Sequence, residues 1–421
     1  MSAATPNLAR SILQRVGEAG QPPEVGIDHL NVGNLGTLAV LRTEYLEPMA
    51  QTGRGSAFKL VQAYYGGGKT HFLYCVRQRA WELGMCSAIV GISPAECPFD
   101  HPKQIYAAVA RELAWPPEDP DCPPARGIDQ TLLTALDERR KQATDEEIVA
   151  WIDGTVRRIP VDSASFRSAV VAFLKAEIAG DATTSELVAS WLRGEDVNLT
   201  EVRHLGIREL VDNETGFRMV RSLCQTLQGI GTPGLLLCFD EIDRVLSLAP
   251  RRRRLVADNL RQLIDLCGRE QLPGLLCLYA VPPEFMTQLV PEYPALQQRL
   301  KGPSALSARS PQAAVIDLEN LDLDPEELLF QIGLRILDLF AVAHGGPQAT
   351  DVQHQNLRDL ARETAQTSFD VAHRRAFVKA AVDMLHAQRE APGRVNAAQL
   401  RTLAGRAAEL TVLAGGGGEE F

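Results

Sequence analysis

The fold is decided by residues 58–73, which read FKLVQAYYGGGKTHFL. The apolar run over residues 58–63 predicts a buried strand, and the apolar spacing after the glycines predicts a helix over residues 70–83. A second apolar strand is expected over residues 87–92. Strand, glycine-rich turn, helix and strand form a β-α-β unit, which is typical of a parallel sheet with helices on both faces.

The glycine run belongs to an eight-residue loop, residues 63–70, which follows the pattern G-x-x-x-x-G-K-[ST] except for Ala63 at its first position. The three glycines are Gly66, Gly67 and Gly68. They allow backbone N–H groups to curl around a phosphate at a helix N-terminus, because glycine adopts positive φ at little cost. Lys69 would then reach the β- and γ-phosphates of ATP, and the Thr70 hydroxyl would coordinate Mg²⁺. The alternative is a glycine-rich turn followed by a chance Lys-Thr pair, but strand, loop and helix all fall where phosphate binding needs them.

A second site is predicted where residues 235–241, LLLCFDE, end in two acids. Open α/β sheets bind their ligands beyond the carboxyl ends of buried strands. Asp240 would hold Mg²⁺, and Glu241 would polarise the attacking water, so hydrolysis is expected in addition to binding. The alternative is a pair of solvated carboxylates at the start of a helix, where the helix dipole also favours them.

Three arginines are candidates for contacts with the nucleotide. Arg299 follows the last strong strand and a short helix, a position from which an arginine of one subunit can reach the γ-phosphate bound by its neighbour. Arg374 and Arg375 open a C-terminal helix, from which a lid could report the state of the nucleotide. In each case the alternative is a surface arginine in an ordinary salt bridge or on a solvated helix face.

Two further features carry weaker expectations. Four consecutive arginines, Arg251 to Arg254, could contact phosphates of DNA or RNA, but aromatic interleaving and a recognition motif are missing. A solvated helix start, or a contact with an acidic neighbouring subunit, is therefore favoured. His71 directly follows Lys69 and Thr70 and is counted with them among the candidate nucleotide-binding residues. A packing or polar role in the helix is the favoured alternative, and His71 has no Cys or second His partner at metal spacing.

The chain is expected to divide into three parts. Residues 1–57 lead into the nucleotide site, residues 58–305 form the ATPase core, and residues 306–421 form a helical or winged-helix lid with a flexible tail. A proline-rich break at residues 116–124 introduces a stretch, residues 118–228, that reads as a helical insertion into the core. The insertion carries no motif that indicates its function.

Composition bounds the class of protein. The 421 residues carry a formal net charge of -10, which argues against nucleic-acid binding by the surface as a whole. None of the 8 cysteines stands at C-x-x-C spacing, so we expect reduced thiols rather than a zinc ribbon. The N-terminal residues lack a signal-peptide profile, and no apolar run approaches the roughly 18 residues of a membrane span. We therefore expect a cytoplasmic protein without a membrane partner.

The motifs together resemble one family. The run over residues 58–73, followed by Ile92-Ser93-Pro94, is similar to the P-loop domain of bacteriophage-exclusion (BREX) ATPases. Residues 238–243 (CFDEID) and 367–371 (TSFDV) are similar to it as well, and among these ATPases the chain looks most like the smaller, BrxD-like type. The resemblance spans about residues 30–390.

The resemblance implies a fold similar to AAA+ and STAND ATPases, ATP and Mg²⁺ as cofactors, and a role in a multi-protein phage-defence system. By that likeness Lys69 and Thr70 carry the nucleotide role, and Asp240 and Glu241 carry the metal and hydrolysis roles. The sequence departs from the broader AAA+ pattern at Ala63 and where Pro282-Pro283 stand in place of the usual polar sensor, so that sensor is unassigned. Both departures bear on the rate of hydrolysis more than on ATP binding.

Two functions of different classes are expected. The first is an ATP-driven motor or switch that works as a homo-oligomer with other phage-defence proteins. The second is a scaffold that binds ATP with little hydrolysis and recruits protein or DNA partners through the helical insertion. A small-molecule kinase fits less well, because an acceptor pocket should add charged residues near the phosphate loop.

Overall fold

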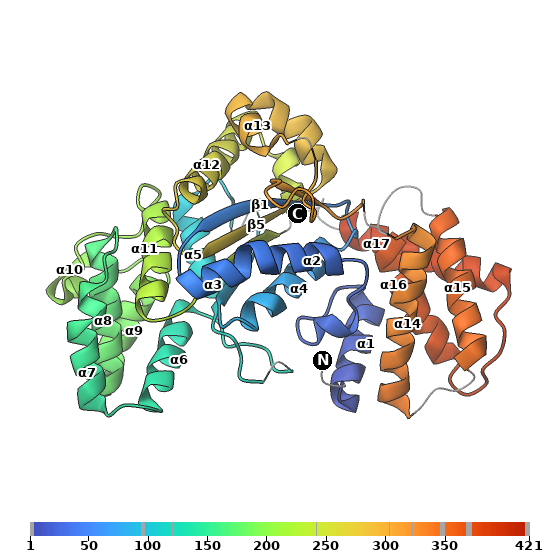
Figure 1. Ribbon diagram of the computed structural model, residues 1–421, viewed down its shortest axis with the longest axis horizontal. Coiled ribbons are helices and arrows are strands. Elements are labelled where there is room, and N and C mark those ends of the chain that lie inside the picture. Colours follow the sequence, from blue (N-terminus) through green and yellow to red (C-terminus); the bar gives the residue numbers. More distant parts are fainter. Residues whose placement is uncertain are drawn as a thin grey trace.

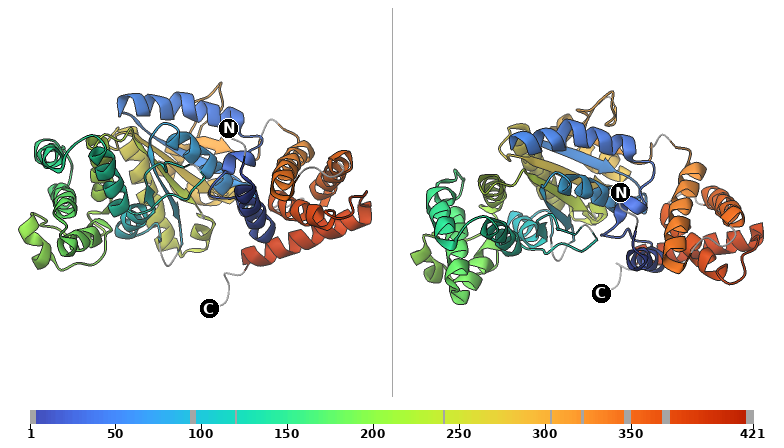
Figure 2. Two further views of the ribbon diagram at one scale, coloured as in Figure 1. Left: turned by 90° about the horizontal axis from the view of Figure 1, so that it is seen from below. Right: turned by 60° about the horizontal axis from the view of Figure 1, so that its bottom comes forward.

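A computed structural model describes residues 4–93, 97–119, 121–240, 242–302, 304–320, 323–345, 350–367 and 373–416. The molecule is elongated, with a β-sheet at its centre (Figure 1). The helices of the insertion lie at one end and the C-terminal helices at the other, and a turned view shows the same order (Figure 2).

The sheet has six strands among the described residues, in the order β3-β2-β4-β5-β1-β6. The strands are β1 (Ser56–Gln62), β2 (Cys86–Gly91), β3 (Leu113–Ala114), β4 (Leu235–Asp240), β5 (Leu275–Val281) and β6 (Val315–Asp317). All neighbours pair in parallel except β2 and β3. β5 lies between β1 and β4, so the glycine-rich loop after β1 and the acidic end of β4 meet at one edge of the sheet.

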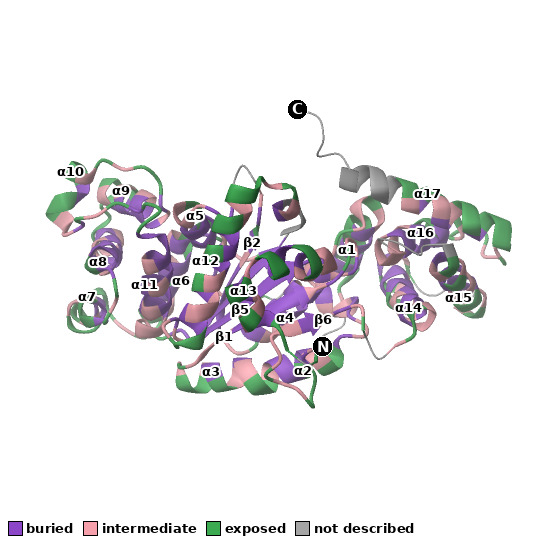
Figure 3. Ribbon diagram, turned by 90° about the horizontal axis from the view of Figure 1, so that it is seen from above, coloured by how far each residue is buried: buried purple, intermediate pink, exposed green. Residues whose placement is uncertain are grey.

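Successive side chains of a strand point to opposite faces of the sheet. The strands are apolar on both faces, and helices cover both of them. The helices around the sheet are α2 (Leu35–Leu41), α3 (Glu47–Thr52), α4 (Lys69–Trp81), α5 (Pro102–Glu112), α11 (Gly216–Gly229), α12 (Pro250–Gly268) and α13 (Pro294–Leu300). Of these, α11 packs on α5 and α13 packs on α12. Val61 and Leu276 face the core beneath α2 and α4, whereas Leu60 and Cys277 face the core beneath α5, α11 and α12. The strands are buried on both sides as a result (Figure 3).

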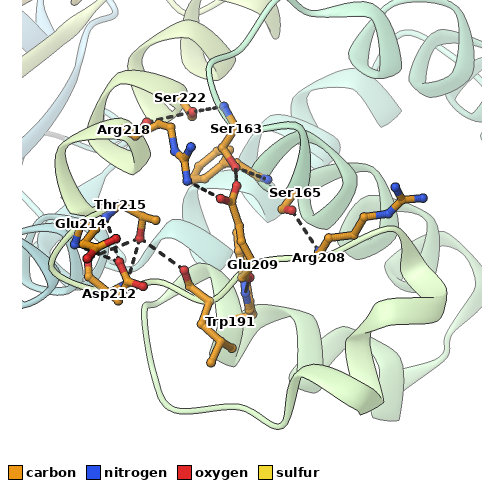
Figure 4. Close-up of polar contacts among 12 residues, drawn as sticks. Ser163, Ser165, Trp191, Arg208, Glu209, Asp212, Glu214, Thr215, Arg218 and Ser222 are labelled. Atoms are coloured by element: carbon orange, nitrogen blue, oxygen red, sulfur yellow. Dashed lines mark hydrogen bonds and ion pairs between the residues drawn. The ribbon is translucent and has the colours of Figure 1, made fainter.

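The insertion packs on the same core as α5 and α11. Its helices are α6 (Ile128–Arg140), α7 (Asp145–Gly154), α8 (Ala164–Ala179), α9 (Ala182–Leu192) and α10 (Leu199–Val202). A polar network ties the segment before α11 to α8 and α11 (Figure 4). Glu209 accepts a hydrogen bond from Ser163 at 2.5 Å and pairs with Arg218, and its carbonyl accepts from Trp191 Nε1 at 2.9 Å. These contacts fix the insertion to the sheet core.

The C-terminal helices form a core of their own. They are α14 (Pro325–His344), α15 (Thr350–Thr367), α16 (His373–Ala387) and α17 (Ala397–Gly416). The N-terminal helix α1 (Pro6–Ala19) buries Leu8, Ile12 and Val16 in this core, against α14 and α16. We call α1 and α14–α17 the lid. No pattern in the sequence predicts that the first helix packs with the last ones.

Short helical turns connect these elements: η1 (Ile27–His29), η2 (Arg42–Leu46), η3 (Val156–Arg158), η4 (Arg203–Leu205), η5 (Ile242–Ser247), η6 (Phe285–Leu289) and η7 (Val290–Glu292). The predicted fold class, a parallel α/β sheet with a helical insertion and a helical lid, is confirmed. The winged-helix alternative is not seen, since residues 323–345, 350–367 and 373–416 contain helices and their connections but no strand. Strands β3 and β6, which have two and three residues, were not predicted from the sequence.

Candidate functional site

The glycine-rich loop connects the carboxyl end of β1 to the start of α4, as predicted. Gly66 and Gly68 have φ values of 72° and 91°, in the left-handed region that glycine tolerates best. Gly68 is the residue that precedes α4, and Phe72 donates its N–H to the Gly68 carbonyl at 2.9 Å. The loop therefore ends at a helix N-terminus, where free N–H groups and the helix dipole favour an anion.

Ala63 occupies the position where the common motif has its first glycine. Its side chain is fully buried in the core beneath α4, and its N–H donates to the Val281 carbonyl at 3.2 Å. The hydrogen bonding to β5 thus extends one residue beyond β1, to Ala63, and φ is not positive there. The loop needs its left-handed residues only at Gly66 and Gly68, so the alanine is compatible with this backbone.

Lys69 is buried at the start of α4, with 7% of its surface exposed. Its Nζ donates to the carbonyls of Ala63 at 3.0 Å and Tyr64 at 3.2 Å. The ammonium group therefore lies inside the curl of the loop. That is the position from which a lysine can meet the phosphates of a nucleotide.

Thr70 and Asp240 meet across the sheet edge. The Thr70 hydroxyl donates to Oδ2 of Asp240 at 2.5 Å, although the two residues are 170 positions apart in the sequence. Asp240 is the last residue of β4 and is 5% exposed. The structure thus brings together the two residues predicted to hold a metal ion. Glu241, the predicted catalytic residue beside Asp240, lies outside the described residues.

Arg374 reaches from the lid to the loop. Its Nη1 donates to the Gly67 carbonyl, and its Nη2 donates to the Leu318 carbonyl at 2.9 Å and lies 3.5 Å from Oε2 of Glu319. Oε1 of Glu319 in turn accepts the N–H of Tyr64 at 3.0 Å. Burial lowers the pKa of the Arg374 guanidinium, and the neighbouring Glu319 carboxylate opposes that shift. One lid arginine and one carboxylate after β6 therefore hold the loop from outside.

Arg375 makes different contacts from its neighbour. Its guanidinium donates twice to the Ala19 carbonyl at the end of α1, at 2.9 and 2.6 Å, and once to Tyr65 Oη at 2.8 Å. Arg375 therefore joins α16, α1 and the loop. The remaining motif near α16, residues 368–372, lies outside the described residues.

A cavity of about 660 Å³ opens between the loop, the segment after α1 and the lid. Gly66, Gly68, Lys69, Thr70 and Asp240 line its polar end, together with Arg374 and Arg375. Several apolar side chains also line it: Val16, Pro22, Leu30, Val32, Leu328, Ile332 and Val378. The remaining lining side chains are polar or aromatic: Arg15, Gln21, Asn34, Tyr65, His71 and Tyr74. These apolar residues were not predicted as part of the site, because they come from three segments far apart in the chain. A polar end with an apolar wall suits a phosphate chain joined to an aromatic base.

His71 also lines the cavity, one residue beyond Thr70. Burial and the nearby Arg374 lower the pKa of its imidazole to about 4, so the ring is neutral at physiological pH. Its Nε2 lies 3.4 Å from Oδ1 of Asn31. Asn31 and Asn34 precede α2 and are buried, with 6% and 7% of their surfaces exposed.

Arg299 does not line this cavity. It pairs with Asp265 of α12 through two contacts of 2.5 and 2.9 Å, and it donates to the Ala295 carbonyl at 2.6 Å. Within the run Arg251 to Arg254, two arginines lie near carboxylates and two are exposed. Arg252 holds both oxygens of Asp100, and Arg253 lies 4.0 Å from Glu292. Arg251 and Arg254 remain as the exposed members of the run.

The described part of the chain contains no helix that is long and apolar enough to cross a membrane. All 8 cysteines are free thiols, and Cys122 alone is exposed among them. Burial raises the pKa of the core thiols, among them Cys75 and Cys238. These cysteines therefore behave as apolar core residues, as the sequence predicts.

We compared the chain with curated proteins, solved structures and family models. No relative was found among curated proteins. Among solved structures, the chain is similar to the ORC2 protein of Aeropyrum pernix in its ADPNP and ADP complexes, with 14% identity and a TM-score of 0.49, over 94% of this chain and 71% of that one. A family model described as BREX system ATP-binding protein BrxC/D matches residues 5–402. The chain therefore belongs to the BrxC/BrxD family of ATP-binding proteins of the BREX phage-defence system.

Proposed function

We propose that this chain hydrolyses ATP with Mg²⁺ and that the lid converts the state of the nucleotide into a movement. The observation that carries the proposal is the 2.5 Å contact between Thr70 Oγ1 and Asp240 Oδ2. It joins the residue after the phosphate-binding lysine to the carboxyl end of β4, at the edge of the sheet where Lys69 also lies. A hydroxyl and a carboxylate are thus held together beside a loop that suits phosphate.

The donor set of this pair fits Mg²⁺. Magnesium prefers oxygen ligands and is commonly held by one or two protein groups together with phosphates and water. Thr70 and Asp240 would supply two such oxygens, and the rest would come from ATP and solvent. When bound, the ion would neutralise charge that develops on the phosphates.

The other residues of the site would each do one part of the reaction. The N–H groups of Gly66–Thr70 and the Lys69 ammonium would bind the phosphates and fix their direction. Glu241 follows Asp240 in the sequence and would orient and polarise the attacking water. Positioning and charge stabilisation would carry the rate, without a covalent intermediate.

The lid would sense the nucleotide through Arg374. In the structure this arginine donates hydrogen bonds to the carbonyls of Gly67 and Leu318. It lines the same cavity as Lys69, so a γ-phosphate would compete with those carbonyls for the guanidinium. A change of Arg374 partner would shift α16, and with it α1 and α14, because these helices share one core.

Arg299, Arg251 and Arg254 are the candidate residues for contacts with other molecules, either a second copy of the chain or DNA. Arg299 would act on a neighbouring copy of the chain only if it exchanged Asp265 for a phosphate, so a homo-oligomer remains a proposal. DNA binding through the four-arginine run would depend mainly on Arg251 and Arg254, since Arg252 is occupied by Asp100. Other phage-defence proteins are the further proposed partners.

ATP hydrolysis and equilibrium ATP binding should be measured for the wild type, Lys69→Ala and Glu241→Gln, with and without duplex DNA, over a range of protein concentrations. The proposal predicts that Glu241→Gln binds ATP like the wild type but loses most turnover, and that Lys69→Ala loses binding. A specific activity that rises with protein concentration would support Arg299 acting between subunits. Tight ATP binding with no turnover by the wild type under every condition would favour the ATP-gated scaffold instead.

A further inference from the structure

Glu319 lies beside the start of the glycine-rich loop because of the strand that precedes it. β6 ends at Asp317 and pairs in parallel with β1. The pairing continues for one more residue, since Leu318 donates its N–H to the Gln62 carbonyl at 2.9 Å. Asp317 Oδ1 then accepts the Glu319 N–H at 3.0 Å. The sheet therefore fixes the backbone of Glu319 next to the point where β1 ends and the loop begins.

The carboxylate of Glu319 contacts both the loop and the lid. Oε1 accepts the Tyr64 N–H at 3.0 Å, and Oε2 lies 3.5 Å from Nη2 of Arg374. Nη1 of the same guanidinium donates to the Gly67 carbonyl. These three contacts close a ring that runs along the loop from Tyr64 to Gly67, across to Arg374 and back through Glu319. The charge of Glu319 therefore acts directly on the lid arginine, at a place where both hold the loop.

Glu319 holds Arg374 without lining the cavity. Among the described residues, Arg374 lines the cavity and Glu319 does not. The carboxylate instead packs against the backbone of Gly67, where a Cβ would collide with Oε1. The side chains of Glu319 and Arg374 are 23% and 14% exposed. Glu319 would therefore act on a bound nucleotide through Arg374, as a positioning residue.

The electrostatics around Arg374 make Glu319 a competitor for a phosphate. Burial lowers the pKa of the guanidinium, and the Glu319 carboxylate opposes that shift. The neighbouring His71 imidazole is neutral at physiological pH, because burial and Arg374 lower its pKa to about 4. A γ-phosphate would bring a second anion to the same guanidinium, and one arginine cannot give its full set of hydrogen bonds to both. A diphosphate lacks that group and would leave the pair of Arg374 and Glu319 in place.

We infer that Glu319 lowers the preference of the site for a nucleoside triphosphate over a diphosphate, because it holds Arg374 on the loop until a γ-phosphate replaces it. The exchange is reversible. Once the γ-phosphate has left, Glu319 takes Arg374 back, and the lid returns to the arrangement seen in the structure. The inference rests on the proposed function, since it requires a nucleotide in this cavity with its γ-phosphate within reach of Arg374.

The test compares the affinities of ADP and of ADPNP, a triphosphate analogue, for the wild type and Glu319→Gln, measured with Mg²⁺ by calorimetry. Glutamine keeps the length of the side chain and an acceptor for the Tyr64 N–H, but it removes the charge that competes for Arg374. The ADPNP affinity should rise roughly fivefold, the size expected for a partly exposed charge-assisted contact, and the ADP affinity should stay within about twofold. An unchanged or smaller preference for ADPNP in Glu319→Gln would overturn the inference.

Arg374 distinguishes a positioning role from a structural one. In an Arg374→Gln background, Glu319→Gln should leave the preference for ADPNP within about twofold, because the charge no longer has its partner. A general loss of support for the loop would instead change both affinities alike and would persist without Arg374, which would overturn the inference. Glu326→Gln is the matched control, since Glu326 of α14 pairs with Arg362 at 3.4 Å, and its preference should equal that of the wild type.

Glu319→Met is the second variant. Methionine keeps the length of the side chain but removes both the charge and the acceptor for the Tyr64 N–H. The preference for ADPNP should rise as in Glu319→Gln, even if both affinities fall because the loop has lost a contact. Denaturant unfolding checks that each variant is folded. If Glu319→Gln is not, the same expectation and the same contrary result apply to Glu319→Met.

Lys69→Ala separates this inference from the proposed function. If Lys69→Ala loses affinity for both nucleotides while Glu319→Gln keeps the wild-type preference, the role of Glu319 alone is wrong. If Lys69→Ala binds both nucleotides like the wild type, the nucleotide does not use this cavity, and both proposals are wrong.

Discussion

Lys59 offers a test of how the core beneath α2 is built. This lysine lies in β1, with 3% of its surface exposed. Its Nζ donates to Tyr45 Oη at 2.6 Å and to the Ala313 carbonyl at 2.8 Å. Burial lowers the pKa of Lys59 from its ordinary value of 10.5 to about 8. Replacing it with methionine removes the titrating group and keeps the length of the side chain.

The magnitude follows from the pKa difference. A fall from 10.5 to about 8 corresponds to roughly 3 kcal/mol, at about 1.4 kcal/mol for each pKa unit. Between these pH values the unfolded chain binds a proton at Lys59 and the folded chain does not, so the free energy of unfolding rises with pH. Below about pH 8 both states are protonated, and this contribution no longer changes with pH.

The assay is denaturant unfolding of the wild type and Lys59→Met at pH 7, 9 and 10.5. The difference in free energy of unfolding, wild type minus variant, should rise by about 3 kcal/mol across this range. An exposed lysine changed in the same way, Lys301→Met, should show no such rise. A difference between wild type and Lys59→Met that stays constant with pH would refute the reasoning.

Three further predictions concern the loop, the lid and the insertion. Gly67→Ala would bring a Cβ to 2.4 Å from Glu319 Oε1 and to 3.0 Å from the Tyr64 carbonyl oxygen, and moving Glu319 aside would break its hydrogen bond from the Tyr64 N–H. ATP affinity measured by calorimetry should therefore fall about tenfold or more, and an unchanged affinity would contradict the packing. Arg374→Ala removes the bond to the Gly67 carbonyl, so amide exchange in α16 of the nucleotide-free protein should accelerate, with equal exchange in both proteins as the contrary result. Glu209→Ala removes the acceptor for Arg218 and should lower the free energy of unfolding by about 1–2 kcal/mol, while ATP affinity stays unchanged. A loss of ATP affinity in Glu209→Ala would mean that the insertion is coupled to the nucleotide site.

The central elements of the fold could be predicted because their signals are local. The strand before Ala63, the glycines after it and the helix from Lys69 lie in one short run, and the apolar residues before Asp240 mark β4 directly. β6 was not predicted, because a pattern of three residues is too short to distinguish a strand from a loop. Its position beside β1 depends on pairing between distant segments.

The candidate site was predictable only at its phosphate end. Lys69 and Thr70 form a recognisable pair, but the cavity is also lined by Val32 and Ile332, which the fold brings to one cavity from distant parts of the chain. No local pattern reports a partner 300 positions away. The partner of Arg299, Asp265, is hidden from the sequence for the same reason.

The central claim is that Thr70 and Asp240 hold Mg²⁺ beside the phosphates of ATP. The most direct test is the Mg²⁺ dependence of ATP affinity in the wild type and in Asp240→Asn, measured by calorimetry with Mg²⁺ or with EDTA. The account predicts that Mg²⁺ strengthens ATP binding by the wild type and that Asp240→Asn loses most of this gain. The same gain in both proteins would contradict the account, because Asp240 would then take no part in holding the ion.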